Sequence, residues 1–287
     1  MSVATGVSAA AARRSRRKLA LTAVAVVAVG IFVFPLYWMV STSLKVDAEL
    51  FTDPPTWFPS HVSFAAYTTA VFDNPQMMTA LGNSAVISFG TMLLTLVVAA
   101  PGAYGLARLR LRWSGLLLLP FLVAQLLPTI NLALPLFALF SQAGLVNTRL
   151  GLVLANTMLT LPFAVIVLRP FYLGIPREME EAAAIDGAGR LQAFLRVVLP
   201  IVMPGLVTVG AFSFVMAWGE FTLGLTLATE TDVQPVTVTL NSFIGQYGTQ
   251  WAPLMAASTV VAIPIVVLFV LFQRFIASGL TAGSVKD

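Results

Sequence analysis

The chain has 287 residues, of which 58% are hydrophobic and 10% charged, and its mean hydropathy is +0.91. This apolar fraction exceeds the roughly 45–50% of soluble domains and therefore indicates an integral membrane protein rather than a soluble one. The absence of cysteine excludes disulfides and thiolate chemistry, and the net charge of +4 needs no nucleic acid partner, because basic residues also serve membrane topology and anionic lipid headgroups.

Six apolar stretches are long enough to cross a bilayer, for which a helix needs roughly 20 residues. They lie at about 19–44, 79–106, 114–140, 150–174, 203–227 and 253–276. Because no water satisfies backbone groups inside a bilayer, each stretch should be helical. The sequence therefore predicts an all-α integral membrane fold with six transmembrane helices.

The N-terminal region carries a basic cluster ahead of the first apolar stretch. Residues 1–18 indicate a flexible cytoplasmic lead, and residues 19–78 hold the first span followed by an outer loop with a Pro54-Pro55 break. The first apolar run is longer than a normal signal-peptide core and lacks a clear small-x-small site, which favours an uncleaved anchor over a signal peptide. Residues 79–276 are expected to form the core membrane domain and residues 277–287 a cytoplasmic C-terminal tail.

The distribution of basic residues predicts the orientation. With six spans, 14 of the 16 lysines and arginines fall on the side of the N-terminus. Cytoplasmic loops of membrane proteins carry this excess of positive charge. Both termini and the loops around 107–113 and 175–202 are therefore expected in the cytoplasm, with a second outer loop at about 228–252.

The loop 175–202 concentrates charge in an otherwise apolar chain. Pro176 suits a first helical position, and acidic residues follow it in the opening turns, where the helix dipole favours anions. Met179 and three alanines, Ala182, Ala183 and Ala184, offer a small apolar surface that another protein can approach closely. Gly187 and Gly189 interrupt the helix at low steric cost.

A second short helix is expected at about 190–198. It would present three apolar side chains, Leu191, Phe194 and Leu195, before Pro200 stops it. Together the two helices predict a helix–turn–helix at the membrane surface. An ordinary amphipathic interfacial connector remains an alternative interpretation.

The same loop carries a spaced motif. It consists of Glu181, Ala182, Ala183, Asp186, Gly187, Leu199 and Pro200, with Val197 where isoleucine is usual. In this spacing the chain resembles the permease subunits of binding-protein-dependent ABC importers. Ile175-Pro176-Arg177-Glu178 and Gly279-Leu280-Thr281-Ala282-Gly283 resemble the carbohydrate branch of that family, specifically its smaller, maltose-type subunit.

The resemblance implies a type I importer permease in the inner membrane of a prokaryote. Its loop 175–202 would dock onto a separate dimer of ATP-binding subunits, which hold the ATP and Mg, and residues 283–287 would contribute to that contact. A second permease would complete the path, and an extracytoplasmic sugar-binding protein would contact the loop 228–252.

The chain itself lacks the residues for ATP hydrolysis. A Walker A motif needs Gly-Lys-Ser or Gly-Lys-Thr, but Lys18, Lys45 and Lys286 follow Arg17, Leu44 and Val285. We therefore expect a non-catalytic transport subunit with no cofactor of its own. Besides the partner proteins that the resemblance implies, we expect contact with membrane lipid and none with nucleic acid.

Polar residues within the spans are candidates for a substrate path. Glu220 is the clearest intramembrane carboxylate. Instead of lining a substrate path, it could form a structural pair or reach the membrane interface. The other candidates are Gln125, Asn131, Asn156 and Trp218. Sugar binding needs hydrogen-bonding groups beside an aromatic platform, but such residues also serve as contacts between helices.

Two other function classes compete with the importer subunit. A self-contained secondary transporter would be expected to show more buried carboxylates or an inverted repeat. A membrane enzyme would need clustered Asp, Glu or His at a cytoplasmic helix end. The acidic cluster of this chain lies instead in the loop 175–202.

Overall fold

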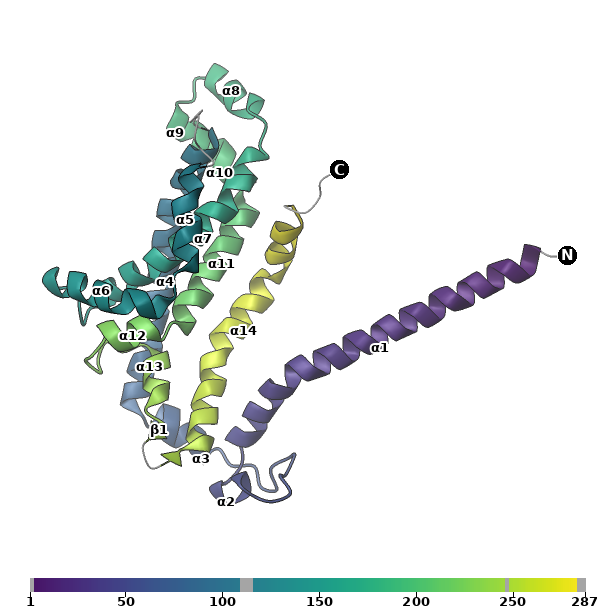
Figure 1. The fold of residues 1–287 in the computed structure, drawn as a ribbon, viewed down its shortest axis with the longest axis vertical. Helices are drawn as coiled ribbons and strands as arrows, with labels where there is room; N and C mark the ends of the chain where they lie inside the picture. Colours follow the sequence, from purple (N-terminus) through teal and green to yellow (C-terminus); the bar gives the residue numbers. More distant parts are fainter. Residues whose placement is uncertain (1–2, 109–115, 246–247, 283–287) are drawn as a thin grey trace.

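The computed structural model describes residues 3–108, 116–245 and 248–282, and side chains over 17–108, 116–245 and 248–273. The described chain is a helical bundle with one small β-hairpin (Figure 1). The loop 109–115, with part of the expected basic loop 107–113, and the tail 283–287 lie outside the described residues.

Five long helices form the frame of the molecule. They are α1 (Val3–Ser43), α4 (Pro75–Arg108), α7 (Arg149–Leu173), α11 (Met203–Gly219) and α14 (Trp251–Ala282). Helix α4 packs against α7 and α11, and α14 packs against α11 and α1. Figure 1 shows α1 leaning away from the bundle, with only its last turns beside α14.

Short elements close the two ends of the bundle. One end, here the α8 end, holds α8 (Glu178–Ile185), α9 (Arg190–Ala193), the π-helix η3 (Phe194–Val198) and α10 (Leu199–Ile201). The opposite end, here the α2 end, holds α2 (Asp47–Leu50), α3 (Ala65–Tyr67), the π-helix η1 (Thr68–Phe72) and the hairpin of β1 (Ile244–Gly245) and β2 (Gly248–Thr249). In the antiparallel hairpin Ile244 faces Thr249 and Gly245 faces Gly248.

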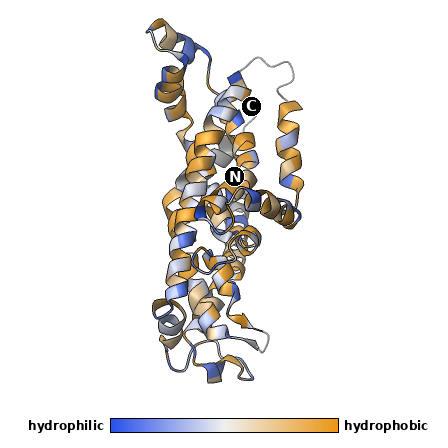
Figure 2. Ribbon diagram, turned by 90° about the vertical axis from the view of Figure 1, so that its left-hand side faces the viewer, coloured by the Kyte–Doolittle hydropathy of each residue, from blue (hydrophilic) through white to orange (hydrophobic). Residues whose placement is uncertain are grey.

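Four helices are long and apolar enough to cross a membrane, and up to six spans result if each of two bent pairs counts as one. Figure 2 shows hydrophobic residues along the length of the bundle and hydrophilic residues around α8 and α9 at the top of the view. The expected all-α membrane fold is therefore confirmed, although two of the six stretches are broken rather than continuous.

The third stretch is broken at Leu127. A 3-10 turn, η2 (Leu116–Leu118), leads into α5 (Leu119–Leu126), which meets α6 (Thr129–Gln142) at an angle of 99°. Leu127 has an extended backbone (ψ 121°) because the following Pro128 disfavours the helical conformation of its predecessor. The stretch 114–140, predicted as one helical span, is therefore two helices joined at a sharp bend.

The fifth stretch is also broken. Helix α11 ends at Gly219, Glu220 is extended (ψ 126°), and α12 (Thr222–Leu227) and α13 (Val236–Asn241) follow as short pieces. Residues 203–227 are thus not the single helix that their composition predicts. The break exposes the amides at the start of α12, and the Glu220 carboxylate accepts hydrogen bonds from two of them.

The ends of the chain are more helical than expected. Residues 3–18, predicted as a flexible lead, form the start of α1, and α14 continues past 276 to Ala282. The alanines and arginines of the lead are good helix formers, which accounts for the first difference.

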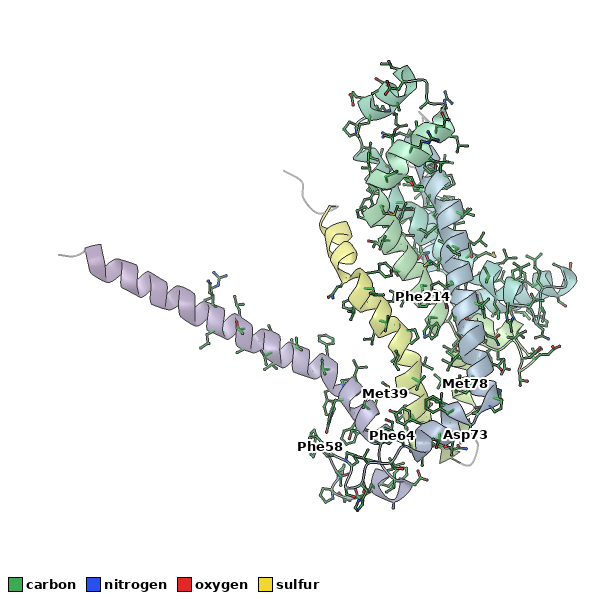
Figure 3. All side chains as sticks on the ribbon, turned by 180° about the vertical axis from the view of Figure 1, so that it is seen from behind. Met39, Phe58, Phe64, Asp73, Met78 and Phe214 are labelled. Carbon is green, nitrogen blue, oxygen red and sulfur yellow. The ribbon has the colours of Figure 1, made fainter. Side chains whose placement is uncertain are left out.

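The segment 45–63, predicted as part of an outer loop, folds back onto the last turns of α1. The hydroxyls of Tyr37 and Ser41 both donate to the carbonyl of Trp57, at 2.5 and 2.9 Å. The buried Lys45 donates to the carbonyl of Thr56 at 2.5 Å, and its ammonium lies 4.6 Å from the ring centroid of Trp38. Figure 3, in which Phe58 and Phe64 are labelled, places this segment at the end of the bundle away from α8.

Candidate functional site

The α8 end is built around a sharp turn between two short helices. Helix α8 begins after Pro176 with three acidic residues in its first turn, which its dipole stabilises. It ends in a pair of hydrogen bonds, from the amide of Gly187 to the carbonyl of Ala184 (3.1 Å) and from the amide of Ala188 to the carbonyl of Ala183 (2.9 Å). This is a Schellman ending, and it requires the positive φ of +82° found at Gly187.

The second helix of the site is longer than the sequence predicts. Helix α9 starts at Arg190, and the helical path continues through η3 and α10 to Ile201. Pro200 does not stop it, contrary to expectation, because the wider π-turn, in which the Leu199 amide bonds the Phe194 carbonyl, accommodates the proline that follows. The chain then turns by 78° into α11.

One face of this helix pair points away from the rest of the chain. We define the outward face as the exposed residues Glu181, Ala182, Ile185, Asp186, Gly187 and Leu191. Ile185 is 87% and Leu191 69% exposed, so two large apolar side chains lie on an accessible surface of the polar loop 175–202. Four predicted coupling residues, Glu181, Ala182, Asp186 and Gly187, thus lie together on one accessible surface.

The opposite face of the pair packs against the chain itself. Ala183 is 9% and Phe194 8% exposed, so neither is presented outward as expected. The helical period explains both, because Ala183 lies one turn from Glu180 on the inner side of α8, and the η3 turn directs Phe194 inward. Leu199 packs against the hydrophobic core cluster that contains Phe194, whereas Pro200 is exposed.

A carboxylate and a guanidinium hold α8 to the end of α4. Glu180 Oε1 lies 2.6 Å from Arg108 Nε, and these side chains are 19% and 12% exposed. The hydroxyl of Tyr104, one turn before Arg108, donates to Glu180 Oε2 at 2.5 Å. Arg108 Nη2 also donates to the carbonyl of Ile175 at 2.9 Å, which fixes the chain just before α8.

Aromatic rings extend this contact to two further elements. The Tyr104 ring lies 4.8 Å from Phe194 of η3 and 5.7 Å from Tyr172 of α7, measured between ring centroids. Beside these rings, between α4 and the helix pair, lies a pocket of about 460 Å³. Arg177, Glu181 and Arg190 are among the residues that line it.

The ion pair was not predicted from the sequence. In the sequence, Glu180 is only one of several acidic residues of the loop 175–202, and Arg108 only one of the basic residues on the side of the N-terminus. No local pattern connects them, because 72 positions of the chain separate the two residues. Among the described residues no group of three His, Cys, Asp or Glu side chains forms a metal site.

The predicted path residues do not lie together. Asn156 is buried and its amide donates to the carbonyl of Leu152 in its own helix (2.8 Å). Trp218 is 3% exposed, donates from Nε1 to the carbonyl of Val261 (3.1 Å) and stacks on Phe214. Trp218 therefore joins α11 to α14, whereas the Asn156 amide bonds within α7.

Gln125 and Asn131 are exposed on either side of the bend between α5 and α6. Gln125 Nε2 donates to the carbonyl of Leu159 at 3.2 Å, which links α5 to α7.

Glu220 caps the start of α12. Its carboxylate accepts hydrogen bonds from the amides of Leu223 (2.9 Å) and Gly224 (3.0 Å). Its own carbonyl accepts from the hydroxyl of Thr237 at 2.7 Å, which fixes the start of α13 beside the break. This geometry favours the structural role over the place in a substrate path, both of which the sequence left open.

The predicted outer loop 228–252 begins with a well-bonded turn. Asn147, whose φ of 56° is unusual for a non-glycine residue, accepts through Oδ1 from the amides of Thr229 (2.7 Å) and Glu230 (3.2 Å). The amide of Asn83 donates to the carbonyls of Asp232 and Gln234, and its oxygen accepts from Arg149 Nε at 2.8 Å. The loop is thus fixed to the starts of α4 and α7.

Comparison with known proteins places this architecture in a family. The sequence profile described as "Binding-protein-dependent transport system inner membrane component" matches residues 97–282. The diacetylchitobiose uptake system permease protein DasC of Streptomyces coelicolor is 37% identical over 254 residues, which cover 88% of this chain and 92% of that protein. The trehalose transport system permease protein SugB of Mycobacterium tuberculosis is 35% identical over 260 residues, 90% of this chain and 94% of that protein.

Solved structures agree on the fold. A chain from a bacterial ABC transporter involved in the import of the acidic polysaccharide alginate has a TM-score of 0.77 at 20% identity. The superposition covers 91% of this chain and 97% of that one. With its matched profile and relatives, the protein belongs to the family of binding-protein-dependent transport system inner membrane components, the multi-pass permease subunits of ABC transporters.

Proposed function

We propose that this chain is one of two permease subunits of an ATP-driven importer for a sugar of the di- or oligosaccharide class. The observation that carries the proposal is the outward face of the α8–α9 pair. It sets two large apolar side chains, Ile185 and Leu191, beside the spaced motif, on a turn fixed by Gly187. Relatives whose names give diacetylchitobiose and trehalose as cargo support the sugar class.

The outward face is the docking surface for a dimer of ATP-binding subunits, which hold the ATP and Mg and hydrolyse the nucleotide. This assignment places the α8 end, the N-terminus and the C-terminus in the cytoplasm, in agreement with the excess of basic residues there. The extracytoplasmic binding protein then contacts the α2 end over the loop 228–252. The exposed apolar side chains along α1 offer a surface that lipid and the second permease can contact.

Two of the predicted path residues fit a translocation path better than the others. Gln125 and Asn131 are exposed beside the bend between α5 and α6, where backbone and side-chain polar groups come together. Non-helical backbone at membrane depth is tolerated where it lines a cavity or is buried in protein. We assign these two residues to the path, with Asn156, Trp218 and Glu220 supporting the helices around it.

The proposal is tested by purifying the tagged full-length chain in mild detergent from its native host and identifying co-purifying proteins by mass spectrometry. Recovery of a P-loop ATPase and a second permease is expected, and the co-purified binding protein is then screened against trehalose, diacetylchitobiose and other oligosaccharides. Recovery of the chain alone, stable and monodisperse, would contradict the importer assignment.

A matched pair of variants locates the docking surface. Ile185→Ser should lose the ATPase subunits, because this side chain is almost fully exposed on the outward face. Ile244→Ser changes the same residue type at an exposed position of the hairpin at the other end, and should retain them. Equal recovery of the ATPase by both variants would argue against docking at the outward face.

A further inference from the structure

The structure assigns a positioning role to the Arg108–Glu180 ion pair: we infer that it makes α8 and α4 move as one unit when the ATP-binding subunits act on the outward face. The inference rests on the proposed docking function and concerns the path from that face into the membrane. It therefore names residues that lie behind the docking surface rather than on it.

The first argument is the separation of two faces on one short helix. Glu181, Ala182 and Ile185 are exposed and free to meet a partner, while Glu180 and Ala183 face the chain itself. A partner bound outside can therefore move α8 without touching Glu180. The inward contacts give this movement a direct route to α4, besides the packing of α7 on α4.

The second argument is the strength of those inward contacts. Both oxygens of the Glu180 carboxylate are used, one by Arg108 at 2.6 Å and one by Tyr104 at 2.5 Å. The contact with Arg108 is a close ion pair, whereas the Tyr104 hydroxyl gives the carboxylate a short charge-assisted hydrogen bond. The two contacts together fix the orientation of the carboxylate. The low exposure of both charged side chains makes separation costly, because each charge would be left without its partner in a poorly solvated place.

The third argument is where the contact leads. Arg108 and Tyr104 belong to the last turns of α4, and α4 continues from there to Pro75 at the opposite end. Helix α4 packs against both α7 and α11, so it lies at the centre of the bundle. The Arg108 bond to the carbonyl of Ile175 ties the linker after α7 to the same point.

The ion pair joins α8 to α4, whereas the aromatic contact joins η3 to both α4 and α7. Phe194 packs against Tyr104 of α4 and Tyr172 of α7, so the ion pair is the charged contact that α8 itself makes with α4. Loss of the ion pair should therefore weaken the response of α4 and leave the docking of the outward face intact. This separation makes the inference testable.

The test uses hydrogen–deuterium exchange of the purified complete complex, with and without ATP-Mg and orthovanadate. In the unmodified complex, nucleotide should change the exchange of peptides from both 175–202 and α4. Arg108→Glu and Glu180→Arg should each retain the ATPase subunits and the response of 175–202, but reduce the response of α4 by about threefold or more.

The double variant Arg108→Glu/Glu180→Arg restores opposite charges and should recover most of the α4 response. Full recovery is not expected, because each swapped charge opposes its helix dipole. Arg177→Glu is the matched control: it reverses the charge of a residue that lines the same pocket outside the ion pair and should leave the α4 response unchanged. Tyr104→Phe, which removes only the hydroxyl, serves if a charge-reversed chain does not fold.

The outcomes separate the two claims. If no ATPase co-purifies with the unmodified chain, the proposed function fails. If it co-purifies but α4 does not respond to nucleotide, or responds equally in the single variants, the positioning role is wrong while the docking surface stands. Failure of the double variant to improve on both single variants also overturns it.

Discussion

Glu180 of α8 and Arg108 of α4 lie 2.6 Å apart, Oε1 to Nε, although 72 positions separate them in the sequence. Together with the Tyr104 hydroxyl they make the loop at the α8 end an extension of the central helix of the bundle. An interfacial connector without such contacts could move independently of the membrane helices. The geometry therefore argues for a loop that is held in a defined position.

Two neighbouring tyrosines allow this contact to be measured. Tyr104→Phe should lower the melting temperature of the detergent-purified chain, because hydrogen bonds to charged groups contribute about 1.5–3 kcal/mol. Tyr172→Phe is the matched control, since its buried hydroxyl has no hydrogen-bond partner among the described residues and its ring lies 5.7 Å from Tyr104. Equal shifts by differential scanning fluorimetry would contradict the role assigned to the Tyr104 hydroxyl.

The turn at Gly187 provides a test of docking. A Cβ added at this position meets no atom within 4 Å, but the φ of +82° favours glycine and asparagine. Gly187→Asn should therefore retain much of the ATPase recovery. Gly187→Asp has the same shape with a charge on the outward face, and should abolish sugar uptake while the chain remains in the membrane.

The control for this pair is Gly189→Ala, which should behave like the unmodified chain. Gly189 has an ordinary φ of −67° and open space around it. Near-normal uptake by Gly187→Asp at matched protein levels would exclude docking at this turn.

The segment 45–63 should loosen in acid. The hydroxyl and amide of Ser60 both donate to the carboxylate of Glu49, and these bonds hold the pKa of Glu49 below its ordinary value of 4.5. A carboxyl whose pKa is lowered by folding stabilises the fold above its unfolded pKa and loses that contribution as the pH falls through its folded pKa. The link should therefore hold at neutral pH and fail below about pH 4.5.

A spin label reports this change. The chain contains no cysteine, so Phe58→Cys, at a position that is 72% exposed in this segment, accepts a single nitroxide. Its mobility by electron paramagnetic resonance should rise as the pH is lowered from 7 to 3. With Glu49→Gln the mobility of the label should already be high at pH 7 and change little as the pH falls. The same pH response with Glu49 and with Glu49→Gln would assign the change to another group.

The coarse features of the fold were predictable from the sequence because they depend on composition and spacing along the chain. Apolar length identifies the spans, and the spacing from Glu181 to Pro200 identifies the loop for which docking is proposed. Helix breaks are harder to predict: Pro101 and Pro162 lie inside continuous helices, whereas the helix ends before Pro128. Neighbouring helices decide which proline is accommodated, and no local pattern contains that information.

The site was predictable only on its outward side. Four motif residues, Glu181, Ala182, Asp186 and Gly187, are local in sequence and exposed together, whereas Ala183 is buried. Which residue of the acidic run turns inward depends on where α8 starts and on what α4 presents to it. The choice of Glu180 rather than Glu181 for the ion pair is thus a tertiary property.

The hydrogen bonds of Asn147 should determine how firmly the loop 228–252 is held. Asn147→Gly keeps the positive φ but removes the acceptor for the amides of Thr229 and Glu230, so both amides should exchange faster with deuterium. Asn147→Ala removes the acceptor and also strains the backbone, by about 1–2 kcal/mol, and should accelerate exchange further. Asn241→Ala, at an exposed position beyond this turn, is the control and should leave the exchange of the Thr229 and Glu230 amides unchanged. Equal effects of the three substitutions would exclude the proposed anchoring.

Two substitutions of Glu220 distinguish a helix cap from an ion-coupling carboxylate. Glu220→Gln retains a side-chain oxygen that can accept from the amides of Leu223 and Gly224, so stability and uptake should stay close to normal. Glu220→Ala removes the acceptor and should lower stability by about 0.5–2 kcal/mol, the range measured for lost helix caps. Both variants are compared by melting temperature and by sugar uptake at matched protein levels.

The opposite pattern would change the function assigned to the chain. A self-contained transporter that couples solute to ions or protons needs the charge of its membrane carboxylate, and Glu220→Gln would remove that charge without disturbing the shape. Loss of uptake by Glu220→Gln, with a normal melting temperature and normal recovery of the ATPase, would place Glu220 in the substrate path. A lowered melting temperature in Glu220→Ala alone supports the cap, because only that variant leaves the amides at the start of α12 without an acceptor.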